Sequence, residues 1–260
     1  MRTPRRHGIP PSALALALLV LAGASAPAAR GGDPVKSTAS DVSIPLPRGG
    51  SLEGTLHRPE TFNGTAVVIA SGQGAHRKGR LFVACADALA GAGFLALRFD
   101  WAYFTAKGQP SAKLAQEVED LEAALAFVRA QEGVKNVILA GKSLGSLVAL
   151  KRAAKKADDL AALALLTFPI HDPGGRPTED VVDVNRLTLP TFVLCGDRDP
   201  LCNLGLLYHL LADAKTPPVV AIVPGDHGLQ GPTKSDSETA ENHDLAARSL
   251  VLWARRRVGS

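Results

Sequence analysis

The sequence predicts an α/β fold, in which a mostly parallel β-sheet carries helices on both faces. Short, continuous apolar segments alternate along the chain with longer segments whose apolar residues recur at helical spacing. Strands without polar alternation are typical of parallel sheets, because both of their faces are buried. The length of 260 residues and the hydrophobic fraction of 46% suffice for one domain with a large core.

The N-terminus is typical of an export signal. Arg2, Arg5 and Arg6 precede an apolar run over residues 13–22, and small residues follow that run. A basic start, a short apolar stretch and a small-residue cleavage site define a secretory signal peptide. A membrane span needs about 20 apolar residues, so this run is too short for one. A retained anchor is the alternative.

These features set the expected boundaries and the meaning of the charge. We expect a signal peptide over residues 1–26, a flexible leader over 27–40 and one folded domain over 41–258. The protein is then exported, periplasmic or secreted, and has no stable membrane insertion after signal cleavage. The formal net charge is +4, and the three arginines of the signal contribute most of this positive charge. The remaining domain has no basic patch that would indicate nucleic acid as a partner.

The expected elements follow one another in the order that an α/β sheet requires. Two alternating strands come first and are joined near Gly49-Gly50. One helix begins after Ser111, its expected N-cap, and closes at Gly133. Strands are expected over residues 42–46, 52–56, 65–70, 94–99, 134–140, 160–168, 191–195 and 219–223, and the other helices over 78–90, 143–157, 201–212 and 241–257.

The segment 139–147, LAGKSLGSL, admits two interpretations. GKS ends a phosphate-binding P-loop, but that loop needs a glycine five positions before the glycine of GKS, where this chain has Asn136. The residues between are apolar and strand-forming, so no room is left for the loop. The other interpretation is the G-x-S-x-G elbow, Gly141 to Gly145, which sets Ser143 on the turn between a strand and a helix. The flanking segments fit that setting.

A serine elbow requires an acid and a histidine further along the chain, each after a later strand. The strand TFVLC leads into GDRDP, which contains Asp199, and the strand VVAIV leads into PGDHG, which contains His227. Asp197 and Asp226 compete with Asp199 for the role of the acid, although both also suit turns. Upstream, TAVVIA ends in SGQG, residues 71–74, a loop that could aim a backbone N–H at the serine.

With these motifs the sequence resembles the α/β-hydrolase fold family, and within it the small, lidless, dienelactone-hydrolase-like members. The resemblance covers essentially all of residues 42–257. It implies that Ser143 is the nucleophile, that Asp199 is the acid within a G-x-x-D-P signature, and that His227 is the base.

The resemblance also implies an oxyanion site built from backbone N–H groups. The donors would be Leu144, the residue after the nucleophile, and Gln73, which aligns with the residue after the family's HG dipeptide. Ser71 replaces the histidine of that dipeptide, which leaves the details of this loop open.

Candidate substrate-binding residues lie in two connections. Trp101, Tyr103 and Phe104 follow the strand ending at residue 99, at the sheet edge where ligands bind in this class of fold. They would form an acyl or alcohol pocket, or pack under a loop. His171 begins the connection in which other family members insert a lid, and it could line the site. The short connection between residues 168 and 191 predicts an open site.

The sequence gives no support for a metal or another cofactor. The patterns H-x-H, H-E-x-x-H and C-x-x-C do not occur. Cys85, Cys195 and Cys202 are too few for a disulfide framework, so buried free thiols are expected, with a Cys195–Cys202 disulfide as the alternative.

The resulting hypothesis is a serine hydrolase that cleaves a carboxylic ester or thioester of a small-molecule acyl substrate through an acyl-serine intermediate. One alternative is a non-catalytic binding protein that retains the fold. Another is a small serine peptidase. Neither the substrate nor the oligomeric state follows from the sequence.

Overall fold

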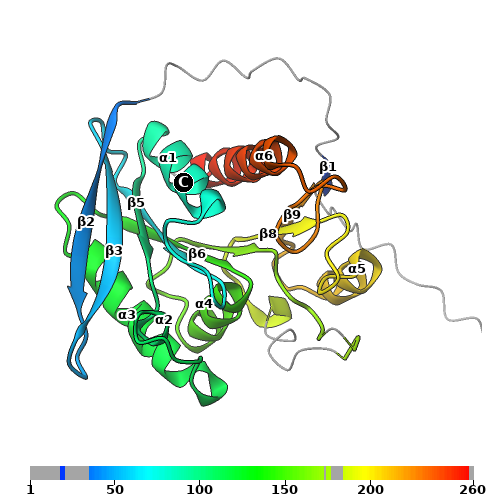
Figure 1. The fold of residues 1–260 in the computed structure, drawn as a ribbon, viewed down its shortest axis with the longest axis horizontal. Helices are drawn as coiled ribbons and strands as arrows, with labels where there is room; N and C mark the ends of the chain where they lie inside the picture. Colours follow the sequence, from blue (N-terminus) through cyan, green and yellow to red (C-terminus); the bar gives the residue numbers. More distant parts are fainter. Residues whose placement is uncertain (1–17, 21–34, 173, 177–183, 258–260) are drawn as a thin grey trace, which may run out of the picture.

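The computed structural model describes residues 18–20, 35–172, 174–176 and 184–257, and it confirms the predicted α/β fold (Figure 1). The strands are β1 (Leu18–Val20), β2 (Ser37–Pro45), β3 (Ser51–Pro59), β4 (Thr65–Ala70), β5 (Leu95–Phe99), β6 (Asn136–Lys142), β7 (Ala162–Leu166), β8 (Thr191–Gly196) and β9 (Val219–Val223). The helices are α1 (Arg80–Gly91), α2 (Ala102–Thr105), the 3₁₀ helix η1 (Ala112–Leu114), α3 (Ala115–Arg129), α4 (Leu144–Lys155), α5 (Leu204–Ala212) and α6 (Asp236–Arg255).

All the strands belong to one sheet with the order β1-β9-β8-β7-β6-β4-β5-β3-β2. Pairing is parallel from β1 to β5 in this order, while β3 pairs antiparallel with both β5 and β2. From β4 the chain therefore goes to β5 on one side and then reverses to β6, β7, β8 and β9 on the other side. Crevices at the carboxyl ends of the strands near such a reversal are where ligands bind in open α/β sheets.

Two hydrophobic layers cover the two faces of the sheet. Successive residues of a strand point to opposite faces, so Val67 and Ile69 pack with α1 and α6, while Val68 packs with α3 and α4. Figure 1 shows α1 and α6 together on one side of the sheet and α3 and α4 on the other. The central strands β4, β5, β7 and β8 are buried along their whole length. This fixed central sheet carries the loops described below.

The N-terminal hairpin begins earlier than expected. β2 starts at Ser37, so the end of the predicted leader, 27–40, is part of a strand that pairs with β3 as far as Pro59. The side chains at 37–41 are exposed. Antiparallel pairing joins backbone groups and does not need apolar side chains. The alternation of apolar and polar residues therefore predicted only the later part of this strand.

Helix starts also differ from the expected ones. A 3₁₀ turn precedes α3, and the Ser111 hydroxyl accepts from the backbone N–H of Gln116 across it. α6 begins at Asp236 rather than 241, because the Ser235 hydroxyl accepts from the Glu238 N–H and caps a polar first turn that has no apolar periodicity. In the described ranges, no helix is long and apolar enough to cross a membrane.

The predicted signal peptide lies outside the described residues apart from Leu18–Val20. These three residues form β1, which pairs parallel with β9 at the edge of the sheet. Signal cleavage and export therefore stay predictions.

A buried histidine joins β3 to β5. The Arg98 Nε–H donates to His57 Nε2 at 2.9 Å, and His57 Nδ1 lies 3.1 Å from an Asp87 carboxylate oxygen. His57 is 2% exposed, and burial followed by the positive charge of Arg98 lowers its pKa below 6.5, while Asp87 opposes this shift. The neutral imidazole therefore accepts from Arg98 and donates to Asp87.

This arrangement predicts that the fold loses stability on mild acidification. The folded-state pKa of His57 lies below the unfolded value, so its contribution is complete above about pH 6.5 and falls as the pH drops below that value, when the unfolded chain binds the proton more readily. We expect the free energy of unfolding, measured in urea between about pH 7 and pH 5, to fall more steeply for the native protein than for His57→Gln. Parallel pH profiles would contradict this assignment.

Candidate active site

Three side chains from distant parts of the chain meet at the carboxyl edge of the sheet. The Ser143 hydroxyl lies 2.8 Å from His227 Nε2, and His227 Nδ1 lies 2.8 and 3.0 Å from the two carboxylate oxygens of Asp199. The Asp199 side chain is fully buried, whereas that of His227 is 22% exposed. Since a carboxylate only accepts hydrogen bonds, Nδ1–H donates to Asp199 and Nε2 accepts from the serine. A proton can therefore pass from the hydroxyl to the ring.

Ser143 sits between β6 and α4 in a strained backbone conformation. Its φ is 54° and its ψ is −118°, a region that residues with a side chain rarely adopt. Glycines on either side make this turn possible. A Cβ on Gly141 would lie 2.7 Å from the Ser146 nitrogen, and a Cβ on Gly145 would lie 2.6 Å from the Ser71 carbonyl oxygen. The G-x-S-x-G spacing is thus a steric requirement of this turn.

The loops that carry the acid and the histidine are tied together. The Asp197 carboxylate accepts from the Gly225 N–H at 2.7 Å, and a Cβ on Gly196 would lie 2.6 Å from the Asp226 carbonyl oxygen. Asp226 accepts from the N–H groups of Gly228 and Gln230 and so forms a local turn. Asp199 is therefore the aspartate that contacts the imidazole, while its two competitors shape the loops.

The loop after β4 lies directly against the serine. A Cβ on Gly72 would be 3.4 Å from the Ser143 Cβ. Among the described residues, neither the Gln73 N–H nor the Leu144 N–H donates to an acceptor. Free backbone donors in the serine turn and in the loop packed against it suit an oxyanion site.

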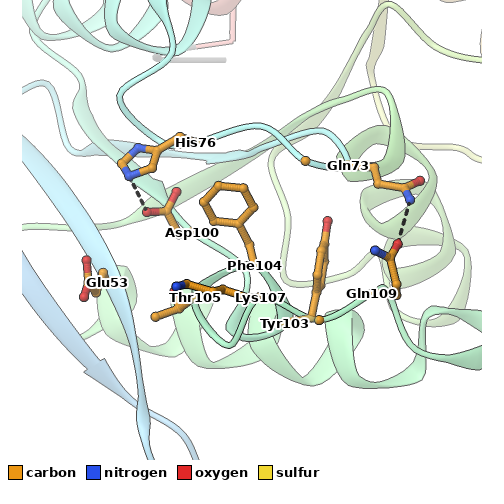
Figure 2. Close-up of a pocket in the computed structure, with 11 residues that line it drawn as sticks. Glu53, Gln73, His76, Asp100, Tyr103, Phe104, Thr105, Lys107 and Gln109 are labelled. Carbon is orange, nitrogen blue, oxygen red and sulfur yellow. Dashed lines mark hydrogen bonds and ion pairs between the residues drawn. The ribbon is translucent and has the colours of Figure 1, made fainter.

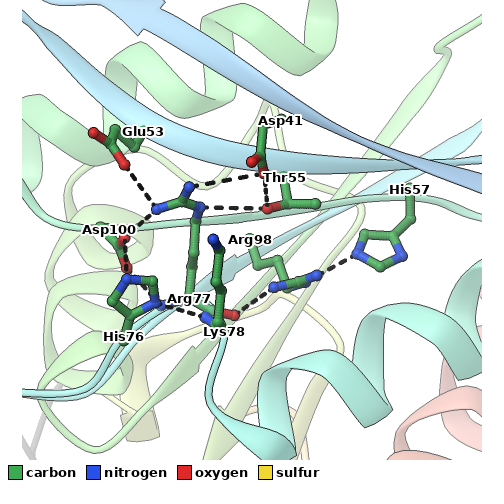
Figure 3. A network of polar contacts seen from close by, with 9 residues as sticks. All are labelled: Asp41, Glu53, Thr55, His57, His76, Arg77, Lys78, Arg98 and Asp100. Carbon is green, nitrogen blue, oxygen red and sulfur yellow. Dashed lines mark hydrogen bonds and ion pairs between the residues drawn. The ribbon is translucent and has the colours of Figure 1, made fainter.

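Both ends of this loop are held by residues in β5 or directly after it. Trp101 Nε1–H donates to the Ser71 carbonyl at 2.8 Å. At the other end, the Arg77 N–H donates to Asp100 and the Arg98 guanidinium donates to the Arg77 carbonyl. The Arg77 guanidinium pairs with Asp100 at 2.5 Å and with Glu53 at 3.0 Å, as Figure 3 shows. The loop is thus fixed at each end by side chains of the neighbouring strand.

Sequence reasoning missed this network. Arg77, Arg98 and Asp100 are all at most 7% exposed. One signal was present, because Arg98 interrupts the apolar strand FLALRF, and a charge buried within a strand needs a partner. The partners lie in other segments, so only the folded chain identifies them.

The residues proposed for substrate binding separate into two groups. Trp101 is fully buried and packs edge to face on Phe99, so it lies under the loop rather than in a cavity. His171 is also buried. Its Nε2 accepts a hydrogen bond from the Asn203 N–H, and this contact holds the segment that follows the Asp199 loop. Tyr103 and Phe104 instead line a cavity of about 580 Å³ beside Gln73 (Figure 2).

Two further groups near the site have perturbed pKa values. Burial lowers the pKa of Lys142, and the carboxylates of Asp199 and Asp226 oppose that shift. Cys195 and Cys202 bracket the Asp199 loop as buried free thiols. A hydrogen bond with Cys195, together with burial, raises the pKa of Cys202, so this thiol stays protonated.

Comparisons with known proteins agree with this architecture. A family model described as an alpha/beta hydrolase domain matches residues 63–255. No curated protein sequence matches the chain. Similar solved structures include Est1E from Butyrivibrio proteoclasticus with bound ferulic acid, with a TM-score of 0.68 and 18% identity, covering 84% of this chain and 100% of that one.

Two other structural neighbours extend the comparison. The Pyrococcus furiosus esterase Pf2001 has a TM-score of 0.69 and 17% identity, covering 86% of this chain and 94% of its own. XC6422 from Xanthomonas campestris, described as a serine hydrolase without a lid, has a TM-score of 0.66 and 20% identity, covering 88% and 99%. At these identities the likeness establishes the fold.

The steric role of the elbow glycines gives a test. Gly141→Ala would force a Cβ into the backbone of the turn, so we expect a loss of about 1–3 kcal/mol in the free energy of unfolding. Gly205→Ala, in the first turn of α5, has a nearest neighbour at 3.3 Å and serves as the control. Denaturant unfolding of both variants measures the difference. Equal stability of the two would show that the turn tolerates a side chain.

Proposed function

The chain belongs to the alpha/beta hydrolase domain family, and from this premise we propose that it is a serine hydrolase that cleaves a carboxylic ester or thioester through an acyl-serine intermediate. The observation that carries the proposal is the unbroken set of hydrogen bonds from Ser143 through His227 to Asp199. A serine hydroxyl is a poor nucleophile until an adjacent imidazole takes its proton.

In the first half of the reaction, Ser143 Oγ attacks the acyl carbon while its proton moves to His227 Nε2. Asp199 keeps Nδ1 protonated and stabilises the imidazolium that forms. The imidazolium then gives its proton to the departing oxygen or sulfur, which leaves as an alcohol or thiol. In the second half, His227 takes a proton from a water molecule that attacks the acyl-serine, and returns it to Ser143.

Negative charge develops on the substrate oxygen in both halves. The N–H groups of Gln73 and Leu144 would donate to that oxygen, and one such donor contributes about 10²–10³ in rate. Their value depends on preorganisation, because donors that are already in place need no rearrangement during the reaction. The anchors at Ser71 and Arg77 hold the Gln73 segment in this way.

Structural neighbours support ester chemistry over amide chemistry. Est1E holds ferulic acid and Pf2001 is an esterase. The His227 side chain is 22% exposed, which suits an accessible site for small acyl substrates.

Activation of Ser143 is directly measurable. A fluorophosphonate probe reacts only with an activated serine, so we expect it to label the native protein and not Ser143→Ala. Hydrolysis of p-nitrophenyl acetate should fall by about 10⁴-fold or more in Ser143→Ala. Ser237→Ala, which removes an exposed serine of α6, is the control.

Two results would contradict the proposal. Absence of labelling in the folded native protein would favour a binding protein that retains the fold. Faster turnover of aminoacyl p-nitroanilides than of p-nitrophenyl esters would favour a peptidase.

We also propose that the enzyme is exported and acts in the periplasm or outside the cell. The basic and apolar start of the chain supports this. Mass spectrometry of the protein from an exporting host should find a new N-terminus after residue 24, 26 or 28. An intact N-terminus on protein held in the membrane would instead indicate a retained anchor.

A further inference from the structure

A cavity of about 580 Å³ lies beside the oxyanion loop, a volume typical of small-molecule sites. One wall is the loop after β4, with Gln73 and His76, and the opposite wall is the segment 103–109 after β5. Figure 2 shows Gln73 facing Gln109 at one end, Tyr103 and Phe104 in the middle, and Glu53, His76 and Asp100 at the other end. The proposed mechanism does not use this space.

The sheet order fixes the side of Ser143 on which the cavity lies. His227 and Asp199 follow β9 and β8, on one side of β6, whereas the cavity lies at the ends of β4 and β5, on the other side. Gly72 lies close to Ser143, since a Cβ on it would be 3.4 Å from the Ser143 Cβ, and Gln73 is the next residue, so the glutamine end of the cavity is the end nearest the serine.

The chemistry assigns the substrate parts to these two sides. The tetrahedral carbon bonds to Ser143 Oγ, the oxyanion, the leaving group and the acyl chain. The leaving group must lie within reach of His227 Nε2, from which it takes its proton. The acyl chain then lies on the side of Ser143 that faces away from the imidazole, and the cavity is on that side.

We propose that this cavity is the acyl site, and that it takes an acyl group with an aryl ring bearing a hydroxyl at its far end. This proposal rests on the proposed function and adds a substrate class to it. The aryl ring lies against Tyr103 and Phe104, and the hydroxyl donates to the Glu53 carboxylate.

The middle of the cavity favours a ring. Tyr103 and Phe104 offer two aromatic surfaces, and the His76 ring already stands edge to face on Phe104, with centroids 5.7 Å apart and an interplanar angle of 82°. Aromatic groups prefer such edge-to-face and offset contacts with one another.

The far end disfavours a long alkyl chain. Methylene groups reaching it would lie against the carboxylate of Glu53 and remove it from water without a hydrogen bond in return. A hydroxyl can donate to Glu53, whose side chain is 60% exposed and so remains accessible beside its ion pair with Arg77. Asp100 is 3% exposed and is already engaged by Arg77.

The first experiment compares acyl groups with one leaving group. The p-nitrophenyl esters of 3-(4-hydroxyphenyl)propanoate, 3-phenylpropanoate and octanoate are assayed by kcat/KM. We expect the hydroxylated aryl ester to be preferred over octanoate. In Phe104→Ala, the ratio of aryl ester to octanoate should fall about tenfold. Tyr208→Ala, which removes an exposed aromatic side chain of α5, is the matched control. A preference for octanoate, or an unchanged ratio in Phe104→Ala, would overturn the proposal.

A second protein variant tests the contact between the substrate hydroxyl and Glu53. In Glu53→Gln, the ratio of hydroxylated to unsubstituted aryl ester should fall about threefold to tenfold, as expected when a neutral amide oxygen replaces a charged acceptor. Glu132→Gln, at an exposed position, is the control. An equal loss on both aryl esters would show that Glu53 acts only on the fold and would overturn its contact with the hydroxyl.

A binding measurement separates this proposal from the catalytic one. Titration of 3-(4-hydroxyphenyl)propanoate into Ser143→Ala needs no turnover, and we expect saturable binding that Phe104→Ala weakens and Tyr208→Ala does not. If the native serine takes the fluorophosphonate label but this binding is absent, the acyl-site proposal fails and the hydrolase proposal stands. If binding occurs without labelling, the hydrolase proposal fails, and the cavity is a binding site for the hydroxyaryl acid rather than an acyl site.

Discussion

The site depends on one close approach of backbone to backbone. The first turn of α4 lies against the end of β4, so that a Cβ on Gly145 would lie 2.6 Å from the Ser71 carbonyl oxygen. This contact brings the loop after β4, which carries Gln73, to the serine turn, which is followed by Leu144. Any side chain at residue 145 would push the two segments apart and so separate the Gln73 and Leu144 N–H groups, the proposed oxyanion donors.

Much of the fold and part of the site follow from sequence because their signals are local. The apolar strands, the elbow and the order of Ser143, Asp199 and His227 each lie within a short segment whose neighbours define it. The start of β2 and the first turn of α6 did not follow, since backbone pairing and a serine cap leave no apolar pattern. Local sequence patterns thus predict the presence of a helix or strand more reliably than its first and last residues.

Non-local contacts account for what the sequence could not supply. The aromatic residues after β5 look alike in sequence, yet Trp101 anchors the Ser71 carbonyl from within the core while Tyr103 and Phe104 line the cavity. The direction of the backbone after β5 decides which of these side chains faces the loop and which faces the cavity. That direction is set only when the sheet is packed. The Arg77 network likewise joins segments from β2 to β5, and none of its members signals its partners along the chain.

The arrangement separates two tasks across the central strand β6. The hydrogen bonds of His227 and Asp199 lie on the β8 and β9 side, and the cavity lies on the β4 and β5 side. The oxyanion loop is the part common to both, and its ends are tied to β5 by Trp101 and Asp100. Substitutions in 103–109 are therefore expected to reshape the proposed acyl site without moving the Ser143–His227–Asp199 contacts, whereas substitutions at 100 or 101 are expected to loosen the loop after β4. Specificity and reactivity are in this way controlled by adjacent residues of the same connection.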